Sequence, residues 1–185
     1  MLSRLVDLLD RKLFESSVAQ SVTAIAATAS GLEASVASLL GVLQRFVGYD
    51  LAAVLLGAER ECYVAVGKPT ATEHYHAFLA AAADAVSSHG GEPIGAGELS
   101  TRVAQAGGEI VDDPEDLPNP DQAEMSTYLS MPLRGHGGSV VGVLALSSGM
   151  KNAFGETALS TLKLIMGPAA IVIDNARLAG ARTHS

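Results

Sequence analysis

The chain is poor in several residue types that particular classes of protein need. Its 185 residues include no tryptophan and only one cysteine, and aromatic residues make up 4% of the chain. The single cysteine, Cys62, excludes an internal disulfide framework and any cysteine pair that could bind a metal or exchange disulfides within one chain. We therefore expect a reducing, cytoplasmic location.

Charged residues are also scarce, at 17% of the chain. This is below the roughly 25% of typical soluble domains, which predicts that a partner covers part of the surface. Twelve Lys and Arg stand against 20 Asp and Glu, for a formal net charge of −8. The basic residues are scattered and form no stripe that could follow a phosphate backbone, so we expect no direct contact with nucleic acid.

Long uninterrupted apolar runs are missing as well. Asp7, Asp10 and Glu15 interrupt the N-terminal segment where a signal peptide would need an apolar core. The most apolar early stretch, residues 18–29, is broken by Gln20, and a membrane span needs roughly 20 apolar residues. We therefore expect neither export nor membrane insertion.

Apolar residues do recur at heptad-like spacing in the first quarter of the chain. The stripe consists of Val18, Val22, Ile25, Ala29, Leu32, Val36, Leu39, Leu43 and Phe46. Ser30-Gly31 falls inside it, and glycine costs about 1 kcal/mol relative to alanine within a helix, which predicts two helices that meet at a bend. We expect the second helix to pack on the chain's own sheet. For residues 18–29, whose small side chains allow close approach, we expect self-association.

The middle of the chain alternates short strands with one helix. Residues 49–56 and 62–67 predict two antiparallel strands joined by a polar turn. Residues 72–90 predict a helix on the edge of the sheet that ends at two glycines. Two further segments, 99–107 and 109–114, are compatible with short strands.

Proline-rich acidic sequence then ends regular structure, and a loop or one short helix is expected up to Met125. Residues 128–133 and 139–147 flank a glycine-rich turn and predict a hairpin. Residues 156–178 are apolar at helical period and predict one long helix, bent at Gly167-Pro168 because proline lacks an N–H donor. The first and last helices are expected to pack together on one face of the sheet.

Three stretches of the sequence resemble the GAF domain family, small-molecule sensor modules of bacterial signalling proteins. "YLSMPLRGHGGSVVGVLALSS" resembles the central hairpin of the family, and "NAFGETALSTLKLIMGPAAIVIDNARL" resembles its terminal helix with the Asn-Ala-Arg-Leu ending. "EIVDDPED" resembles the segment before the ligand-side loop. The resemblance covers roughly residues 32–178.

The resemblance implies an α+β fold related to PAS domains. Its features are a central six-stranded antiparallel sheet, N- and C-terminal helices on one face, and a ligand pocket on the other face. The acidic stretch before the hairpin is expected to fold over that pocket as a lid. The implied boundaries are a dimerisation or signalling helix over residues 1–30, the GAF domain over 31–179, and a tail over 180–185.

The sequence leaves the ligand and any cofactor unknown. The residues expected to line the pocket are Arg102, Asp112, Tyr128 and Ser130, with His76 at its edge. Arg102 is the sole basic residue between Lys68 and Arg134, so a ligand carboxylate or phosphate would have few other cationic partners.

Several ligands known for the family remain open or are disfavoured by particular residues. Asn152, Phe154 and Glu156 match the cyclic-nucleotide pattern only in part. Cys62 lies on an early predicted strand, which argues against a covalently bound bilin, and one cysteine cannot complete the thiol cycle of methionine sulfoxide reduction. A single histidine such as His76 could serve as a haem ligand.

Metal binding and catalysis are not expected. His74 and His76 are spaced so that they cannot chelate one metal from a regular helix. The acidic residues between Asp112 and Glu124 could hold a hard cation through oxygen ligands, but their spacing matches no established metal loop. No catalytic serine, phosphate-cradling or zinc motif is present in the sequence.

The sequence therefore predicts a regulatory sensor domain rather than an enzyme. We expect a homodimer in which ligand binding shifts the N- and C-terminal helices and so controls an attached or partner output domain. The alternative is a GAF fold without a ligand that serves dimerisation or protein docking. An open pocket favours the sensor, whereas a filled one favours the scaffold. A haem or flavin sensor is a third hypothesis.

Overall fold

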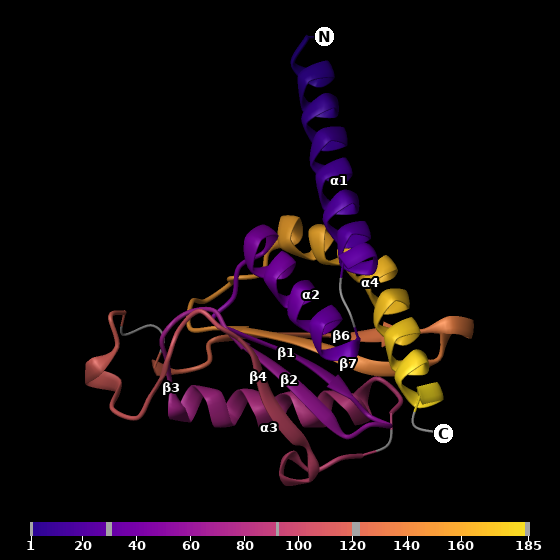
Figure 1. The fold of residues 1–185 in the computed structure, drawn as a ribbon. Helices are drawn as coiled ribbons and strands as arrows, with labels where there is room; N and C mark the ends of the chain where they lie inside the picture. Colours follow the sequence, from indigo (N-terminus) through magenta and orange to yellow (C-terminus); the bar gives the residue numbers. More distant parts are fainter. Residues whose placement is uncertain (1, 29–30, 92, 120–122, 184–185) are drawn as a thin grey trace.

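The computed structural model describes residues 2–28, 31–91, 93–119 and 123–183. They form an α+β fold in which helices cover both faces of a sheet (Figure 1). The main sheet has the strand order β4-β2-β1-β7-β6. Its strands are β1 (Leu51–Leu56), β2 (Glu61–Val66), β4 (Ser100–Ala106), β6 (Thr127–Arg134) and β7 (Val140–Ser148).

The direction of one strand pair differs from the prediction of six antiparallel strands. Within the described residues the main sheet has five strands, and β2 and β4 run parallel. The reason is helix α3 (Thr72–Ser88), which lies between β2 and β4 in the chain and supplies the crossover that a parallel pair requires. The predicted strand at 109–114 shortens to β5 (Ile110–Val111), which pairs with β3 (Thr70–Ala71) outside the main sheet.

The central strand β1 is buried along its whole length because both of its faces are covered. Its sequence, LAAVLL, is an uninterrupted apolar run. Ala52, Val54 and Leu56 belong to the core under the terminal helices. Leu51, Ala53 and Leu55 belong to a second core under α3. Successive side chains of a strand point to opposite faces, so one strand serves both cores.

One face of the sheet carries three helices: α1 (Leu2–Thr28), α2 (Leu32–Phe46) and α4 (Glu156–Thr183). Helix α4 contacts both α1 and α2, so the predicted packing of the first and last helices is confirmed. The predicted division into two helices is also confirmed, with Gly31 at a φ of 97° just before α2. Ala29 and Ser30 lie outside the described residues.

The side chains of α1 that we expected to join a second copy lie elsewhere. Val18, Val22 and Ile25 are buried in this chain's own core together with residues of α2 and α4. These three side chains are therefore not available to a second copy, and self-association of residues 18–29 stays a prediction. The second half of α1 lies across α2 and α4, which turns the apolar stripe toward the body of the protein (Figure 1).

Helix α3 covers the opposite face of the sheet. The sequence had predicted that it lies at the edge of the sheet instead. Phe78, Ala82 and Val86 are buried and stand four residues apart, on one side of the helix. The stripe packs against apolar side chains of β1 and β7, among them Ala53 and Ala145, so α3 lies over the middle of the sheet. An apolar stripe of this width needs a sheet face rather than a sheet edge.

Pro168 lies inside α4, and Figure 1 shows the first turns of this helix running in a different direction from its later turns. By length and composition the segment Glu156–Gly180 would suffice to cross a membrane. Leu162, Ile165 and Ile173 are nevertheless buried in the core of this protein. The apolar character of α4 is thus explained by packing on the sheet.

The packing of α3 predicts the effect of truncating its largest buried side chain. We expect Phe78→Ala to lower the free energy of unfolding by about 3–5 kcal/mol, because the change removes buried apolar surface and leaves a cavity. Met150→Ala, at a residue that is 54% exposed, should change it by less than about 0.5 kcal/mol. Urea unfolding followed by circular dichroism measures both, and equal effects would contradict the assigned core.

Candidate functional site

Helix α4 carries a buried carboxylate near its C-terminal end. Asp174 is 2% exposed. Its Oδ2 accepts a hydrogen bond of 2.9 Å from the backbone N–H of His136, in the turn between β6 and β7. Its Oδ1 accepts bonds from Nε and Nη2 of Arg177, at 3.2 and 2.8 Å. One side chain therefore holds both the hairpin turn and the guanidinium group.

The hairpin turn fits against this carboxylate because residue 135 is glycine. A Cβ atom at Gly135 would lie 2.4 Å from Oδ2 of Asp174 and 2.7 Å from its Cγ. A second contact joins the turn to the helix, since Nε2 of His136 lies 2.7 Å from Oδ1 of Asn175. The tip of the hairpin is thus attached to α4 at two neighbouring residues.

Arg177 extends the network to a second turn. Its Nη1 lies 3.1 Å from Oε1 of Glu59, in the turn between β1 and β2. That turn and the hairpin turn lie at the same end of the sheet, because Leu56 at the end of β1 faces both Glu61 and Gly142. The last turns of α4 are therefore tied to two turns at this end.

The charges of the network stabilise one another. Burial alone would raise the pKa of Asp174, but hydrogen bonds from the His136 N–H and from Arg177, together with the Arg177 charge, lower this pKa below its ordinary value. Burial alone would lower the pKa of Arg177, and the bonds to Asp174 and Glu59 raise it instead. Asp174 and Arg177 are therefore both ionised at neutral pH.

A cavity of about 460 Å³ opens beside Arg177, and we refer to it as the end cavity. Its walls come from the β1–β2 turn, the end of α3, the start of β7 and the last turns of α4. The lining residues are Gly57, Ala58, Val86, Gly90, Gly91, Ser139, Val140, Val141, Gly142 and Arg177. Four of these are glycines, so backbone forms much of the wall, and Arg177 brings the charge.

Arg177 keeps hydrogen-bonding capacity at the end cavity. A guanidinium group has five N–H donors. Three of them are used in the bonds to Asp174 and Glu59 described above. On the other side of the ion pair, Oε2 of Glu59 is buried and has no hydrogen-bond partner within the described residues. The pair thus has both donors and an acceptor that a small polar molecule could use.

Two of the residues predicted from the sequence lie together under α3. Tyr128 donates a hydrogen bond of 3.1 Å from its hydroxyl to the carbonyl of Ala81, and burial raises its pKa. The hydroxyl oxygen of Ser130 lies 3.1 Å from Nε2 of His89. Both side chains belong to the edge strand β6 and are engaged with α3.

The structure does not bring the other three predicted residues to this place. Arg102 on β4 lies 3.5 Å from Glu33 of α2, on the opposite face of the sheet. Oδ1 of Asp112 accepts a 2.8 Å hydrogen bond from Thr72 at the start of α3. His76 is exposed on the outer side of α3, next to the ring of Tyr75.

The sheet face expected to hold the pocket is covered by α3 rather than by the acidic stretch. Asp112 ties that stretch to the first residue of the helix, and Asp113 accepts a 3.0 Å bond from the backbone N–H of Glu115. Deeper under α3, Nε2 of His74 lies 2.9 Å from the hydroxyl of Ser147, and both residues are buried. The predicted lid therefore forms a flank at one end of α3.

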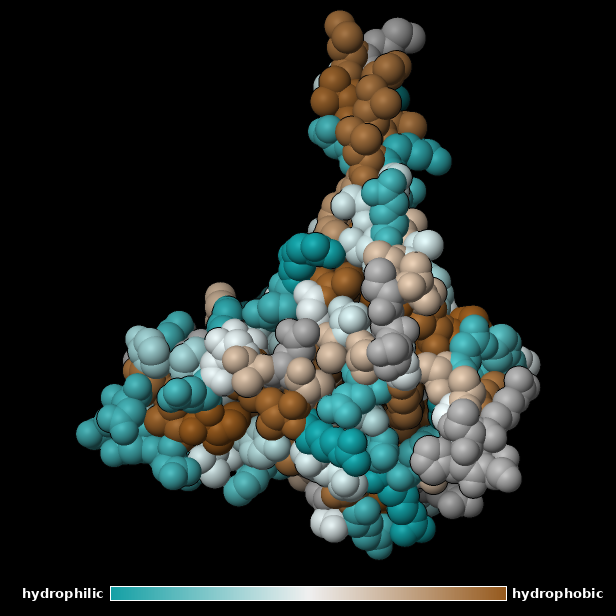
Figure 2. Space-filling view, viewed as in Figure 1, coloured by the Kyte–Doolittle hydropathy of each residue, from teal (hydrophilic) through white to brown (hydrophobic). Residues whose placement is uncertain are grey.

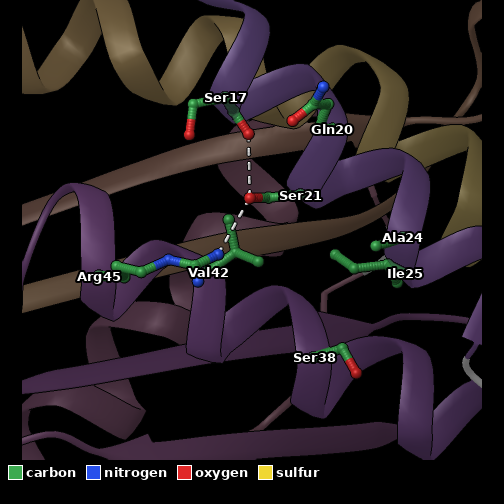
Figure 3. A pocket seen from close by; sticks show the side chains of 8 residues that line it. All are labelled: Ser17, Gln20, Ser21, Ala24, Ile25, Ser38, Val42 and Arg45. Atoms are coloured by element: carbon green, nitrogen blue, oxygen red, sulfur yellow. Dashed lines mark hydrogen bonds between the residues drawn. The ribbon is translucent and has the colours of Figure 1, made fainter. Parts of the chain in front are cut away.

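Two open grooves run between the helices on the other face. One, of about 410 Å³, lies between α1 and α2, where Ser21 accepts a 3.0 Å bond from Arg45 and donates one to the carbonyl of Ser17 (Figure 3). A second, of about 630 Å³, separates the middle of α1 from the start of α4. Among the described residues, no three His, Cys, Asp or Glu side chains are grouped to hold a metal ion.

A family model for the GAF domain matches residues 29–174 of this sequence. The chain belongs to the GAF domain family. The matched segment extends from the residues before α2 to Asp174, so Arg177 follows its end by three residues. Glu59, Asp174 and Arg177 were not among the site residues predicted from the sequence, although Arg177 belongs to the Asn-Ala-Arg-Leu ending that resembles the family.

A solved structure supports the same fold. The GAF domain from Acinetobacter phosphoenolpyruvate-protein phosphotransferase superposes with a TM-score of 0.51 at 12% sequence identity, and the match covers 91% of this chain and 98% of that one. At this identity the likeness concerns the fold. No curated protein matches the sequence.

The environment of Asp174 predicts a pH-dependent contribution to stability. Because the folded pKa lies below the ordinary value of 3.8, the contribution is fully present above that pH and is lost as the pH falls through the folded pKa. We expect Asp174→Asn to destabilise the protein by about 2 kcal/mol at neutral pH. The difference from wild type should shrink below about pH 4. Urea unfolding at a series of pH values measures the free energy of unfolding of both proteins, and Asp116→Asn, at an exposed residue, is the control. A loss of stability in Asp174→Asn that does not depend on pH would contradict the prediction.

The close contact at residue 135 yields a separate prediction. We expect Gly135→Ala to cost about 1–3 kcal/mol of stability, because the new methyl group would push the hairpin turn away from Asp174. Gly155→Ala is the matched control, since a Cβ there meets no atom within 4 Å. Thermal unfolding of the two variants measures the contrast, and equal stabilities would show that the turn accommodates the methyl group.

Proposed function

We propose that this chain is a regulatory sensor domain that binds a small molecule in the end cavity and thereby alters how α4 is attached to the sheet. One observation carries the proposal: Arg177 lines the cavity and also holds α4 to the β1–β2 turn through Glu59. Membership of the GAF family supports a sensor or regulatory role in general. The proposed role is not catalytic.

The proposed ligand is a small molecule with a carboxylate or phosphate group. Arg177 has a planar set of N–H donors that suits such anions, and two of these donors are not used by Asp174 or Glu59. The volume of about 460 Å³ lies within the range of small-molecule sites. An anion bound there competes with Glu59, whose turn can move away into solvent.

The proposed signal passes along α4. When Arg177 turns from Glu59 to a ligand, α4 stays attached to the hairpin turn through Asp174 and the backbone N–H of His136, but it loses the link to the β1–β2 turn. Helix α4 contacts α1 and α2, so a change in its position reaches both of these helices. The ligand must bind one arrangement more tightly than the other for this to shift the population. An attached or partner output domain would respond to the helices.

A second candidate function is a scaffold without a ligand. It is favoured by the packing of α3, whose Phe78, Ala82 and Val86 occupy the sheet face on which a family ligand pocket was expected. In that case the domain would act only through its surfaces, and Arg177 would serve stability alone.

Thermal stability in the presence of candidate ligands separates the two functions. A panel of carboxylates, phosphates, nucleotides and amines is tested at constant ionic strength. A ligand at a hundred times its Kd should stabilise the wild type by about 2.7 kcal/mol, which raises Tm by roughly 5–10 °C. Arg177→Gln should abolish the gain. Arg134→Gln, at an exposed arginine on the neighbouring hairpin that does not line the cavity, should preserve it.

A third variant distinguishes binding from stability. Ala58 is exposed and lines the end cavity, but it takes no part in the Arg177 network. Ala58→Trp should therefore leave the unliganded Tm almost unchanged and remove the ligand response. If no compound in the panel raises Tm, or if Arg177→Gln responds like the wild type, the scaffold function is favoured.

A further inference from the structure

The first half of α1 projects beyond the body of the protein and presents bare apolar side chains (Figures 1 and 2). Its exposed large apolar residues are Leu2, Leu5, Val6, Leu8, Leu9, Leu13 and Phe14. Leu2 is 83% exposed and Leu13 is 68% exposed. At the end of this segment nearest the body, the ring of Phe14 packs against the ring of Phe46 in α2, with 5.6 Å between the ring centroids. Such a concentration of exposed leucine is a mark of an interaction surface.

The two halves of α1 present apolar side chains on opposite sides. In the second half, Val18, Val22 and Ile25 face the body and are buried. In the first half of α1, the side that faces the same direction as Val18 and Val22 carries charged residues, among them Arg11 and Asp7. Leu2, Leu9 and Leu13 lie roughly half a turn away, at 3.6 residues per turn. The body of the same chain therefore cannot cover them.

The outward side of α1 has a heptad repeat along its whole length. The residues of this outward stripe are Leu2, Val6, Leu9, Leu13, Ser16, Gln20, Thr23 and Ala27. Their spacing alternates between four and three, and every one of them is exposed. The half that projects is apolar, whereas the half beside the body is small or polar. A repeat of this kind is the pattern of a helix that pairs with another helix.

We propose that the occupant of the outward stripe is the same stripe of a second copy, in a parallel, in-register coiled coil. A parallel pair places each stripe residue beside its own counterpart across a two-fold axis, so one surface suffices for both partners. Leu2 and Leu9 then take d positions, and Val6 and Leu13 take a positions. Leucine at d with the β-branched Val6 at a favours two strands.

The charges of the segment favour this occupant over a membrane surface. Between Arg4 and Glu15 the helix carries three basic residues and three acidic ones. A helix that lies on anionic lipid needs a polar face enriched in lysine and arginine. Balanced charges on the side opposite the leucines suit a solvated helix pair.

The half of the stripe nearest the body completes the interface. The projecting segment alone, residues 2–14, is about 20 Å long at 1.5 Å per residue, which is short for an isolated helix pair. Ser16, Gln20 and Ala27 continue the same stripe with small or uncharged side chains, so the two helices can remain in contact until they reach the bodies. The paired helices would thereby bring the two bodies next to each other. This inference goes beyond the proposed ligand function and does not depend on it.

Analytical ultracentrifugation of the full chain tests the pairing. We expect the wild type to be a dimer, and Leu9→Lys to weaken dimerisation by at least tenfold because it puts a charge at a d position. Leu8→Lys is the matched control: Leu8 is 63% exposed against 55% for Leu9, but it lies off the stripe. A monomeric wild type, or equal losses in the two variants, would overturn the proposal. Both residues lie outside the folded body, so its Tm should not change.

Cysteine cross-linking tests the parallel register independently. Val6→Cys and Leu13→Cys should each form a covalent dimer under mild oxidation, because a parallel pair places every stripe residue beside itself. Asp7→Cys should form no covalent dimer, because residue 7 lies on the other side of the helix. The native Cys62 is buried and should not interfere with the test. The parallel register would be refuted if neither stripe variant cross-links, or if Asp7→Cys cross-links as efficiently as the stripe variants. Binding of a monomeric wild type to anionic vesicles would assign the leucines to a membrane instead.

Discussion

The buried carboxylate of Asp174 is the constraint on which the end of the sheet depends. A charge that is removed from water is tolerated only where donors replace the solvent, and here they come from the His136 backbone and from Arg177. Each donor imposes a further requirement. The backbone donor brings the hairpin so close that residue 135 has no room for a side chain, and the guanidinium reaches the β1–β2 turn through Glu59. Helix, hairpin and turn are thereby fixed relative to one another.

Because both faces of the sheet are covered by helices, the proposed ligand site lies at the end of these layers and not on a sheet face. Helices α1, α2 and α4 occupy one face, and α3 lies on the other with Phe78 in its centre. Space remains where these layers end, and there the chain uses glycines that leave the backbone bare. A residue at that end which also belongs to a core helix is well placed to relate binding to helix position, and Arg177 is such a residue.

The regular elements could be predicted from the sequence because their signals are local. Apolar residues at helical spacing predicted α2 and α4, and the apolar runs beside the glycine-rich turn predicted each end of the two hairpin strands to within one residue. The parallel pairing of β2 with β4 has no local signal, since "ECYVAV" reads the same whichever direction its neighbour takes. The candidate site is equally nonlocal. Asp174 meets His136 across 38 residues and Arg177 meets Glu59 across 118, and neither separation leaves a trace in a short motif.

The position of β1 in the sheet also governs the order in which this protein can assemble. Its neighbour β2 follows within a few residues, but its other neighbour β7 pairs Ala145 with Ala53, 92 residues later. A nascent chain therefore carries the most apolar strand with one open edge until the last quarter has been synthesised. During that interval the face of β1 under the terminal helices also lacks part of its cover, because α4 follows β7. Ribosome-bound or truncated forms that end before β7 are thus the species in which this domain is most exposed to aggregation and to chaperones.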